Sequence, residues 1–275
     1  MLLLGALVAA GCGGAGEAGG SGVSLAVTRD FGHEQVDSAR LSELPDGATA
    51  LSLLRSESDV EDPDSGWSYF VNGVRPDEPA GEYELSPADR VQWDRSDSPA
   101  RAIVGAFPEP FLHGLNGERR PVRVECDDTE SAPCRDAKQA LEDADVPTSG
   151  SSLGAPGTEH VTRLVVARWP AARIVRGGYT LERGPEANGI FARFAAGGRA
   201  LELLDENGDV ARTMHPGDGT ALIAALRPRA EELLWLVTAL DERGLVAGVK
   251  ALRGAPLRNA YAVAVTGKSV AKLPL

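Results

Sequence analysis

VSLAVTRDF, residues 23–31, is the stretch from which the fold of the N-terminal third of the chain can be read. Its apolar and polar side chains alternate, as they do in a strand that buries one face. The run QVDSARLSEL, residues 35–44, alternates in the same way, and Gly32 and His33 lie between the two runs. The sequence therefore predicts two half-buried strands that form a hairpin.

One short helix and further strands follow this hairpin. The segment ATALSLLRSE, residues 48–57, comes after a Pro-Asp-Gly turn signal and places its leucines on one helical face. An acidic loop leads to GWSYFVNGV, residues 66–74, and then to GEYELSPADRVQWDR, residues 81–95. These segments predict two or three more strands. Two strands, a helix and more strands form the order expected of a β-grasp domain, a mixed sheet over one helix.

The chain has 275 residues, which is enough for two domains. We expect the first over residues 23–97 and the second over residues 98–275. Strand, helix and strand patterns follow one another over residues 120–169 and again over residues 232–265, with a predicted hairpin at Asn207-Gly208 between them. The predicted fold class is α+β throughout. The second domain is a candidate for a duplicated strand-helix-strand unit.

The N-terminus has the features of an export signal. Residues 1–11, MLLLGALVAAG, form a short apolar run that ends in small residues, which is typical of a signal peptide. The run is much shorter than the ~20 apolar residues of a membrane-spanning helix. It resembles a bacterial lipobox ending at Cys12, although Ala9 stands where leucine is usual. We expect a lipid anchor on Cys12, a flexible tether over residues 12–22 and a location on the extracytoplasmic face of the cell membrane. A secreted protein with a free N-terminal cysteine is the alternative.

The net charge and the cysteines indicate which partners and which covalent links are expected. The formal net charge of −12 disfavours nucleic acid as a partner of the chain. Cys126 and Cys134 stand close together in ECDDTESAPC, and an exported chain meets an oxidising compartment. We predict a disulfide that joins a strand end to a helix and stabilises the fold by roughly 2.5 kcal/mol. A two-cysteine metal site is the alternative, and no histidine lies nearby in the sequence.

No motif argues positively for catalysis, so we expect neither an enzyme nor a bound cofactor. Gly150–Gly154, GSSLG, matches the hydrolase pattern G-x-S-x-G. It lies in a loop predicted over residues 146–157, without the strand and helix that a nucleophile elbow requires. The four histidines are scattered, so their spacing predicts no metal site. The acidic loop that contains Asp59 and Glu61 could collect a cation or form a solvated surface.

Aromatic residues are scarce, yet four of them gather on neighbouring predicted strands: Trp67, Tyr69, Phe70 and Trp93. Alternation along a strand places Trp67 and Tyr69 on one face of the sheet and Phe70 on the other. We expect one face to be core and the other to be exposed, where rings can offer a platform to a flat ligand or a protein. The alternative is that the rings pack under loops or under the second domain.

The same region resembles the transcobalamin-like C-terminal family, a β-grasp domain of the soluble-ligand-binding type that occurs in bacterial surface proteins. The resemblance rests on LAVTRDFG, TALSLLR, GWSYFVNGV and EYELSPADRVQWD, between about residues 23 and 95. In the cobalamin carriers this domain lies over one face of the corrin ring. The resemblance implies ligand binding by Trp67, Tyr69 and Asn72. Trp93 is a further candidate ligand-binding residue, because it belongs to the same aromatic cluster.

Two departures from this family limit what the resemblance implies. The carriers cover the other face of the ligand with a helical barrel that is not recognised here, and their usual Gly-Asp turn before the last strand is Ala88-Asp89. We therefore expect a membrane-anchored lipoprotein that binds a small ligand, with a corrinoid as first candidate, for capture or uptake. A helical-barrel protein or a transporter is the expected partner. A non-enzymatic cell-envelope interaction or structural module is the alternative function.

Overall fold

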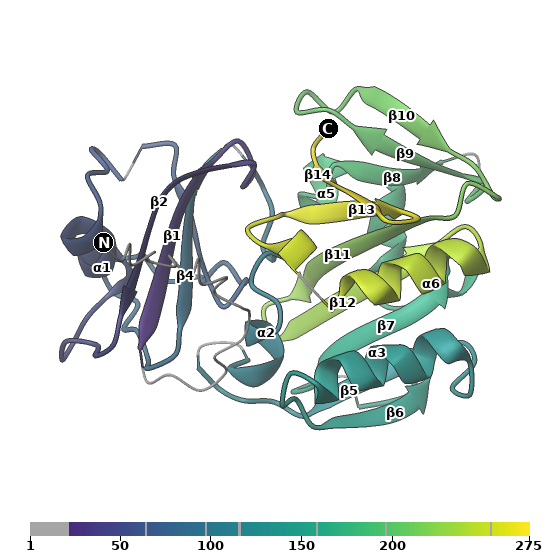
Figure 1. Cartoon of the computed structure of the whole chain (residues 1–275), viewed down its shortest axis with the longest axis horizontal. Coiled ribbons are helices and arrows are strands. Elements are labelled where there is room, and N and C mark those ends of the chain that lie inside the picture. The colour runs from purple at the N-terminus through teal and green to yellow at the C-terminus, as the bar shows by residue number, and fades with distance from the viewer. Residues whose placement is uncertain are drawn as a thin grey trace, which may run out of the picture.

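The computed structural model describes residues 22–63, 65–96, 98–114, 117–157, 159–195, 197–253 and 255–275. Mixed sheets and helices make up this part of the chain, which confirms the predicted α+β class. A small sheet with one helix forms the N-terminal part, and a larger sheet forms the rest (Figure 1). The expected signal peptide, the expected lipidation site Cys12 and nearly all of the expected tether lie outside the described residues.

The N-terminal sheet has four strands, in the order β2-β1-β4-β3. They are β1 (Val23–Arg29), β2 (Glu34–Leu41), β3 (Ser68–Val71) and β4 (Arg90–Arg95). β1 is antiparallel to β2 and parallel to β4, whereas β3 is antiparallel to β4. The predicted hairpin is confirmed, because β1 and β2 pair across the turn that contains Gly32 and His33.

The predicted helix is α1 (Ala50–Glu57), and it begins two residues later than expected. Thr49 acts as its N-cap: the Thr49 hydroxyl accepts a hydrogen bond from the backbone N–H of Ser52, and the Ser52 hydroxyl accepts one from the backbone N–H of Thr49. Leu53 and Leu54 are buried against one face of the small sheet, where they meet Val27 and Trp93. This cluster is the core of the N-terminal domain.

The larger sheet has seven strands in the order β14-β13-β11-β12-β7-β5-β6. They are β5 (Val122–Cys126), β6 (Thr148–Ser152), β7 (Thr162–Arg168), β11 (Thr220–Arg229), β12 (Glu232–Ala239), β13 (Ala262–Thr266) and β14 (Ser269–Leu273). The helices α3 (Ala132–Glu142) and α6 (Glu242–Ala251) lie side by side on one face of this sheet (Figure 1). Val124, Leu141, Trp235 and Leu245 are among the buried side chains of that layer.

A second, antiparallel sheet packs on the opposite face of the larger sheet. Its strands are β8 (Ala192–Ala195), β9 (Ala200–Leu204) and β10 (Val210–Met214), and the predicted turn at Asn207-Gly208 joins the last two. The remaining short elements are α2 (Glu109–Leu112), α4 (Trp169–Ala172), η1 (Gly178–Glu182), α5 (Pro185–Asn188) and η2 (Ala255–Leu257). Buried side chains of this layer include Phe194, Leu201 and Leu222.

A strand, a helix and a parallel strand occur twice in the larger sheet. In β5-α3-β6 the two strands are direct neighbours, whereas in β12-α6-β13 the antiparallel strand β11 lies between them. The loop predicted over residues 146–157 is wrong in part, because β6 extends the sheet edge there. A disulfide joins Cys126 at the end of β5 to Cys134 in the first turn of α3, as predicted.

One hydrophobic cluster spans both parts of the chain. Phe31 and Phe70 of the N-terminal domain contact Tyr261 of the second domain edge to face, with ring centroids 5.5 Å apart in each pair, and Phe31 also contacts Phe191. All four rings are buried in one cluster. The prediction that one face of the small sheet is exposed is therefore wrong, because the second domain covers the face opposite α1.

Polar contacts reinforce this interface. The Asp94 carboxylate, fully buried, accepts hydrogen bonds from the Thr28 hydroxyl at 2.6 Å, the Gly32 backbone N–H at 2.8 Å and the Tyr261 hydroxyl at 3.1 Å. The Gln92 side-chain amide donates to the backbone carbonyl of Asn259.

Within the described part of the chain, no helix is long and apolar enough to cross a membrane.

Candidate functional site

The aromatic segment before and within β3 divides its side chains between two faces, as predicted. Phe70 points towards the second domain and is completely buried there. Trp67 and Tyr69 pack instead against the core beneath α1, and both remain partly exposed. The alternation therefore holds, but at β3 and β4 both faces are covered, whereas the side chains of the edge strand β2 are exposed or partly exposed.

Trp93 does not reach the surface. Its exposed fraction is 3%, and it lies in the core beneath α1. Tyr69 stacks on it with ring centroids 5.4 Å apart, and the Tyr69 hydroxyl donates to the backbone carbonyl of Glu78. Burial, with the Glu78 carboxylate nearby, raises the pKa of the Tyr69 phenol and keeps it neutral. The prediction that Trp93 binds ligand directly is thus contradicted by its burial, and Tyr69 presents only part of its ring.

Asn72 is also buried, with an exposed fraction of 1%. Its side-chain amide donates to the Asp89 carboxylate at 2.7 Å and accepts from the Arg90 backbone N–H at 2.9 Å. Burial raises the pKa of Asp89, although hydrogen bonds from the Ser86 backbone and from Asn72 oppose the rise. Asn72 therefore holds the turn before β4 and does not face a ligand, which corrects the role that the resemblance implied. The neighbouring Ala88 has a φ of 72°, a left-handed conformation that favours glycine.

Trp67 is a predicted site residue that lines a groove. A groove of about 410 Å³ opens at the edge of the N-terminal domain beyond the last turn of α1. Trp67 and the 40% exposed Val36 give it apolar surface, and the loop after α1 forms a second wall. The residues that line it are Val27, Arg29, Val36, Asp37, Ser58, Asp59, Val60, Glu61, Trp67 and Arg95. This groove is the candidate ligand site of the molecule.

Strand register explains why these side chains meet. Arg29 at the end of β1 pairs with Arg95 at the end of β4 in the parallel ladder. Ser68 pairs with Asp94 in the antiparallel ladder, so the preceding Trp67 lies next to Arg95. Because Val27, two residues before Arg29, belongs to the core beneath α1, both arginines emerge on the α1 side of the sheet. Trp67, Arg95 and Arg29 therefore form a row across three strands.

The acidic loop contributes to the groove rather than to a metal site. Asp59 and Glu61 line its wall, and among the described residues no group of three or more His, Cys, Asp or Glu side chains is placed to hold a metal ion. The sequence reasoning missed both arginines. The sequence shows only that each arginine stands at or near the end of a predicted strand. The pairing of β1 with β4, which the sequence does not reveal, brings the two arginines together.

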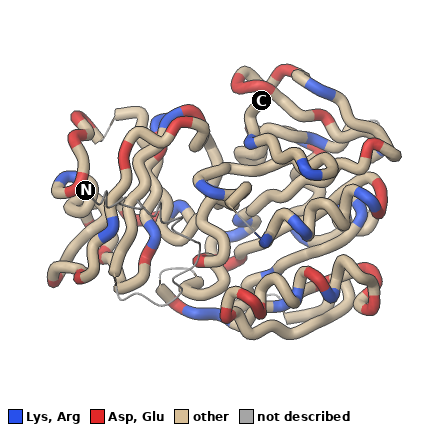
Figure 2. Tube along the Cα trace, in the orientation of Figure 1, with Lys and Arg blue, Asp and Glu red and all other residues tan. Residues whose placement is uncertain are grey.

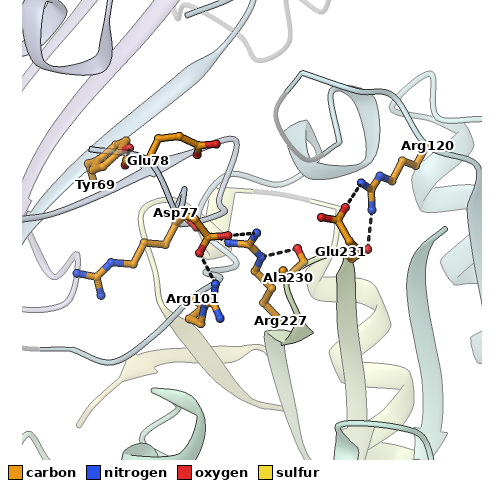
Figure 3. A network of polar contacts seen from close by, with 9 residues as sticks. Tyr69, Asp77, Glu78, Arg101, Arg120, Arg227, Ala230 and Glu231 are labelled. Carbon is orange, nitrogen blue, oxygen red and sulfur yellow. Dashed lines mark hydrogen bonds and ion pairs between the residues drawn. The ribbon is translucent and has the colours of Figure 1, made fainter. Parts of the chain in front are cut away.

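A charged cluster fixes the loop that supports Tyr69 (Figure 3). Arg227 of β11 forms an ion pair of 2.8 Å with Asp77, and its guanidinium also donates to the backbone carbonyls of Arg75 and Ala230. Arg101, in the segment between the domains, donates to the same Asp77 carboxylate. Because Asp77 adjoins Glu78, whose carbonyl accepts from Tyr69, the second domain holds this side of the aromatic cluster in place. A separate pair, Arg120 with Glu231, joins the segment before β5 to the turn between β11 and β12 (Figure 3).

The fold and the groove together define an α+β protein whose small N-terminal domain has an open, mixed polar and apolar site at one edge. Residues 49–96 match the model of a family described as Domain of unknown function (DUF4430). The matched segment runs from the N-cap of α1 to the residue after β4, and so includes Trp67 and Arg95. No curated protein matches the chain.

Proposed function

We propose that this chain is a lipoprotein, anchored through Cys12 on the extracytoplasmic face of the cell membrane, whose N-terminal domain binds a small ligand. The observation that carries the ligand-binding role is the groove of about 410 Å³ beside Trp67. Pockets for small molecules are ~300–1,000 Å³ and combine apolar walls with a few polar groups. Half-buried Trp67 supplies a rigid apolar wall, and the polar groups come from both strand ends and the loop after α1.

The resemblance to the transcobalamin-like family makes a corrinoid the first ligand to test. The sheet order β2-β1-β4-β3 with one helix on a face supports the β-grasp interpretation on which that resemblance rests. A corrinoid exceeds the groove in size, so the groove would hold one edge of it. The rest of the ligand would then require a second surface, from a helical-barrel protein or a transporter component.

Calorimetric titration of the purified chain with cobalamin, alone and with such a partner, tests this proposal. Trp67→Ala should weaken binding by on the order of tenfold or more, since stacking on an aromatic platform is worth about 1–3 kcal/mol. Tyr179→Ala is the matched control, because Tyr179 is a 48% exposed aromatic residue outside the groove. Equal affinities of Trp67→Ala, the control and the unaltered chain would refute binding in the groove.

The anchor has its own test. Cys12→Ser should release the chain from the membrane fraction, because the proposed lipid is attached to that thiol. Fractionation with an antibody against the second domain measures this, and mass spectrometry of the N-terminal peptide identifies the acyl groups. Full membrane retention of Cys12→Ser would contradict a lipid anchor at this residue.

An envelope interaction module is the second candidate function, and one surface feature favours it. Ile174 is 75% exposed, and nearby in the chain Tyr179 is 48% exposed with the Arg183 guanidinium over its ring. Exposed apolar side chains beside aromatic and arginine residues are common at protein interfaces. A photo-crosslinking residue at position 174 in living cells should give one discrete adduct, whereas the same residue at Val210, 44% exposed, should not.

A further inference from the structure

Two arginine side chains stand next to each other at the mouth of the groove. Arg29 and Arg95 are direct partners in the parallel ladder of β1 and β4, both are exposed, and both line the groove. None of the described carboxylates forms an ion pair with either guanidinium. Glu34 is the partner of Arg29 in the antiparallel ladder of β1 and β2, but the two side chains form no ion pair, so a bound anion would relieve the repulsion between the like charges of Arg29 and Arg95.

The opposite wall of the groove carries the other sign of charge. Asp59 and Glu61 lie in the loop after α1. Asp37 also lines the groove, but from β2, next to the strand that carries Arg29. With three carboxylates and two guanidinium groups among its described lining residues, the groove as a whole is not cationic. A ligand with several negative charges would therefore meet repulsion from the loop wall wherever it extends beyond the arginine pair. A ligand with one negative charge avoids that repulsion.

We infer that the groove binds ligands through a single anionic group held between Arg29 and Arg95, with a flat apolar body against Trp67. The inference rests on the proposed ligand-binding function and specifies its chemistry. Guanidinium groups bind carboxylate or phosphate oxygens through paired, charge-assisted hydrogen bonds. The row Trp67, Arg95, Arg29 crosses three adjacent strands, which sets the anion beside the ring rather than above it. An additional ammonium, hydroxyl or amide group on the ligand would find acceptors at Asp59 and Glu61.

Four fluorinated probes of one shape separate these contributions. They are 3-(4-fluorophenyl)propionate, a monoanion; 4-fluoro-L-phenylalanine, a zwitterion; 2-(4-fluorophenyl)ethanol, which is neutral; and 4-fluorophenethylamine, a cation. Each is titrated against the purified chain, and fluorine NMR line broadening gives the Kd. We expect the monoanion and the zwitterion to bind about five- to tenfold more tightly than the alcohol, in line with an exposed charge-assisted hydrogen bond. The amine should bind no more tightly than the alcohol.

Substitutions test which groove residues bind the anionic group. Arg29→Gln and Arg95→Gln should each weaken binding of the monoanion about three- to tenfold and leave binding of the alcohol unchanged. Glu61→Gln should strengthen binding of the monoanion. Arg40→Gln is the matched control, because Arg40 is an exposed arginine of β2 outside the groove. Circular dichroism spectra of all variants check the fold.

The outcomes distinguish this inference from the proposed function. If Trp67→Ala weakens every probe while both arginine variants bind the monoanion as tightly as the control, the groove binds ligands but not through an anion, and the inference is overturned. If Trp67→Ala alters no probe, binding in the groove itself fails. If the monoanion and the zwitterion do not bind at all, the inference is also overturned, whereas the cobalamin titration still decides the proposed function.

Discussion

Phe70→Ala tests whether the two domains form one cooperative unit. Phe70 is completely buried between the small sheet and the second domain, where it contacts Tyr261. A phenylalanine buries about 150–250 Å², which at ~25 cal/mol per Å² corresponds to roughly 4–6 kcal/mol as an upper bound. Measured Phe→Ala substitutions in cores cost about 3–5 kcal/mol. We therefore expect Phe70→Ala to lower the free energy of unfolding by about 4 kcal/mol.

Urea unfolding measures this loss, and the tryptophans report on each domain. Trp67 and Trp93 lie in the N-terminal domain, whereas Trp169 and Trp235 lie in the second. Replacing either pair with phenylalanine leaves a fluorescence signal from one domain. Because the rings share one cluster, both signals should move together to a midpoint lower by about 1.3–2 M, for a slope of about 2–3 kcal/mol per M.

The control is Ile174→Ala, which truncates a 75% exposed side chain and should move neither midpoint measurably. If Phe70→Ala lowered only the midpoint reported by Trp67 and Trp93, the domains would unfold independently. That result would refute the argument that the interface is part of the core, as would a loss below about 1 kcal/mol.

Three further results are expected. Trp93→Ala should lower the free energy of unfolding by about 3–5 kcal/mol, because Trp93 is buried, whereas Trp67→Ala should keep the fold, as circular dichroism melting will show. Replacing Cys126 and Cys134 together with alanine should cost about 2.5 kcal/mol in urea unfolding, and an unchanged midpoint would contradict a stabilising disulfide. Asp241→Ala should cost about 1–2 kcal/mol at pH 7, because Asp241 caps α6. Burial opposes ionisation of Asp241, but hydrogen bonds from three backbone N–H groups outweigh it and lower its pKa. Its stabilisation is therefore present above the unfolded pKa of about 3.9 and lost as pH falls through the lower folded pKa, so the two proteins should converge in stability below about pH 4.

Local sequence patterns predicted the parts of the fold whose causes are local. Alternation over residues 23–44 identified the hairpin, because each strand buries one face, and the leucines of residues 48–57 identified α1. The disulfide followed from the short spacing of its cysteines together with a strand and a helix pattern on either side. These features require no knowledge of distant contacts.

Contacts between residues far apart in the sequence determine which side chains are buried, and local patterns do not reveal those contacts. Alternation separated Phe70 from Trp67 correctly, but it could not show that Tyr261 and Phe191 cover the Phe70 side. Trp93 looked like Trp67 in sequence, and only the place of β4 between β1 and β3 shows that it is core. The serine- and glycine-rich β6 has only Thr148 as a strand-favouring residue, and it forms a strand through pairing with β5.

The pairing of β1 with β4 connects the domain interface to the groove. Thr28 pairs with Asp94 and Arg29 pairs with Arg95, so along both strands one residue faces the second domain and the next faces the groove. Asp94 holds the Thr28 hydroxyl and is itself held by the Tyr261 hydroxyl. The second domain thus anchors the strand ends that carry the two arginines, and it does so from the face opposite the groove. A partner protein or a large ligand can therefore approach the groove from the α1 side without displacing the second domain.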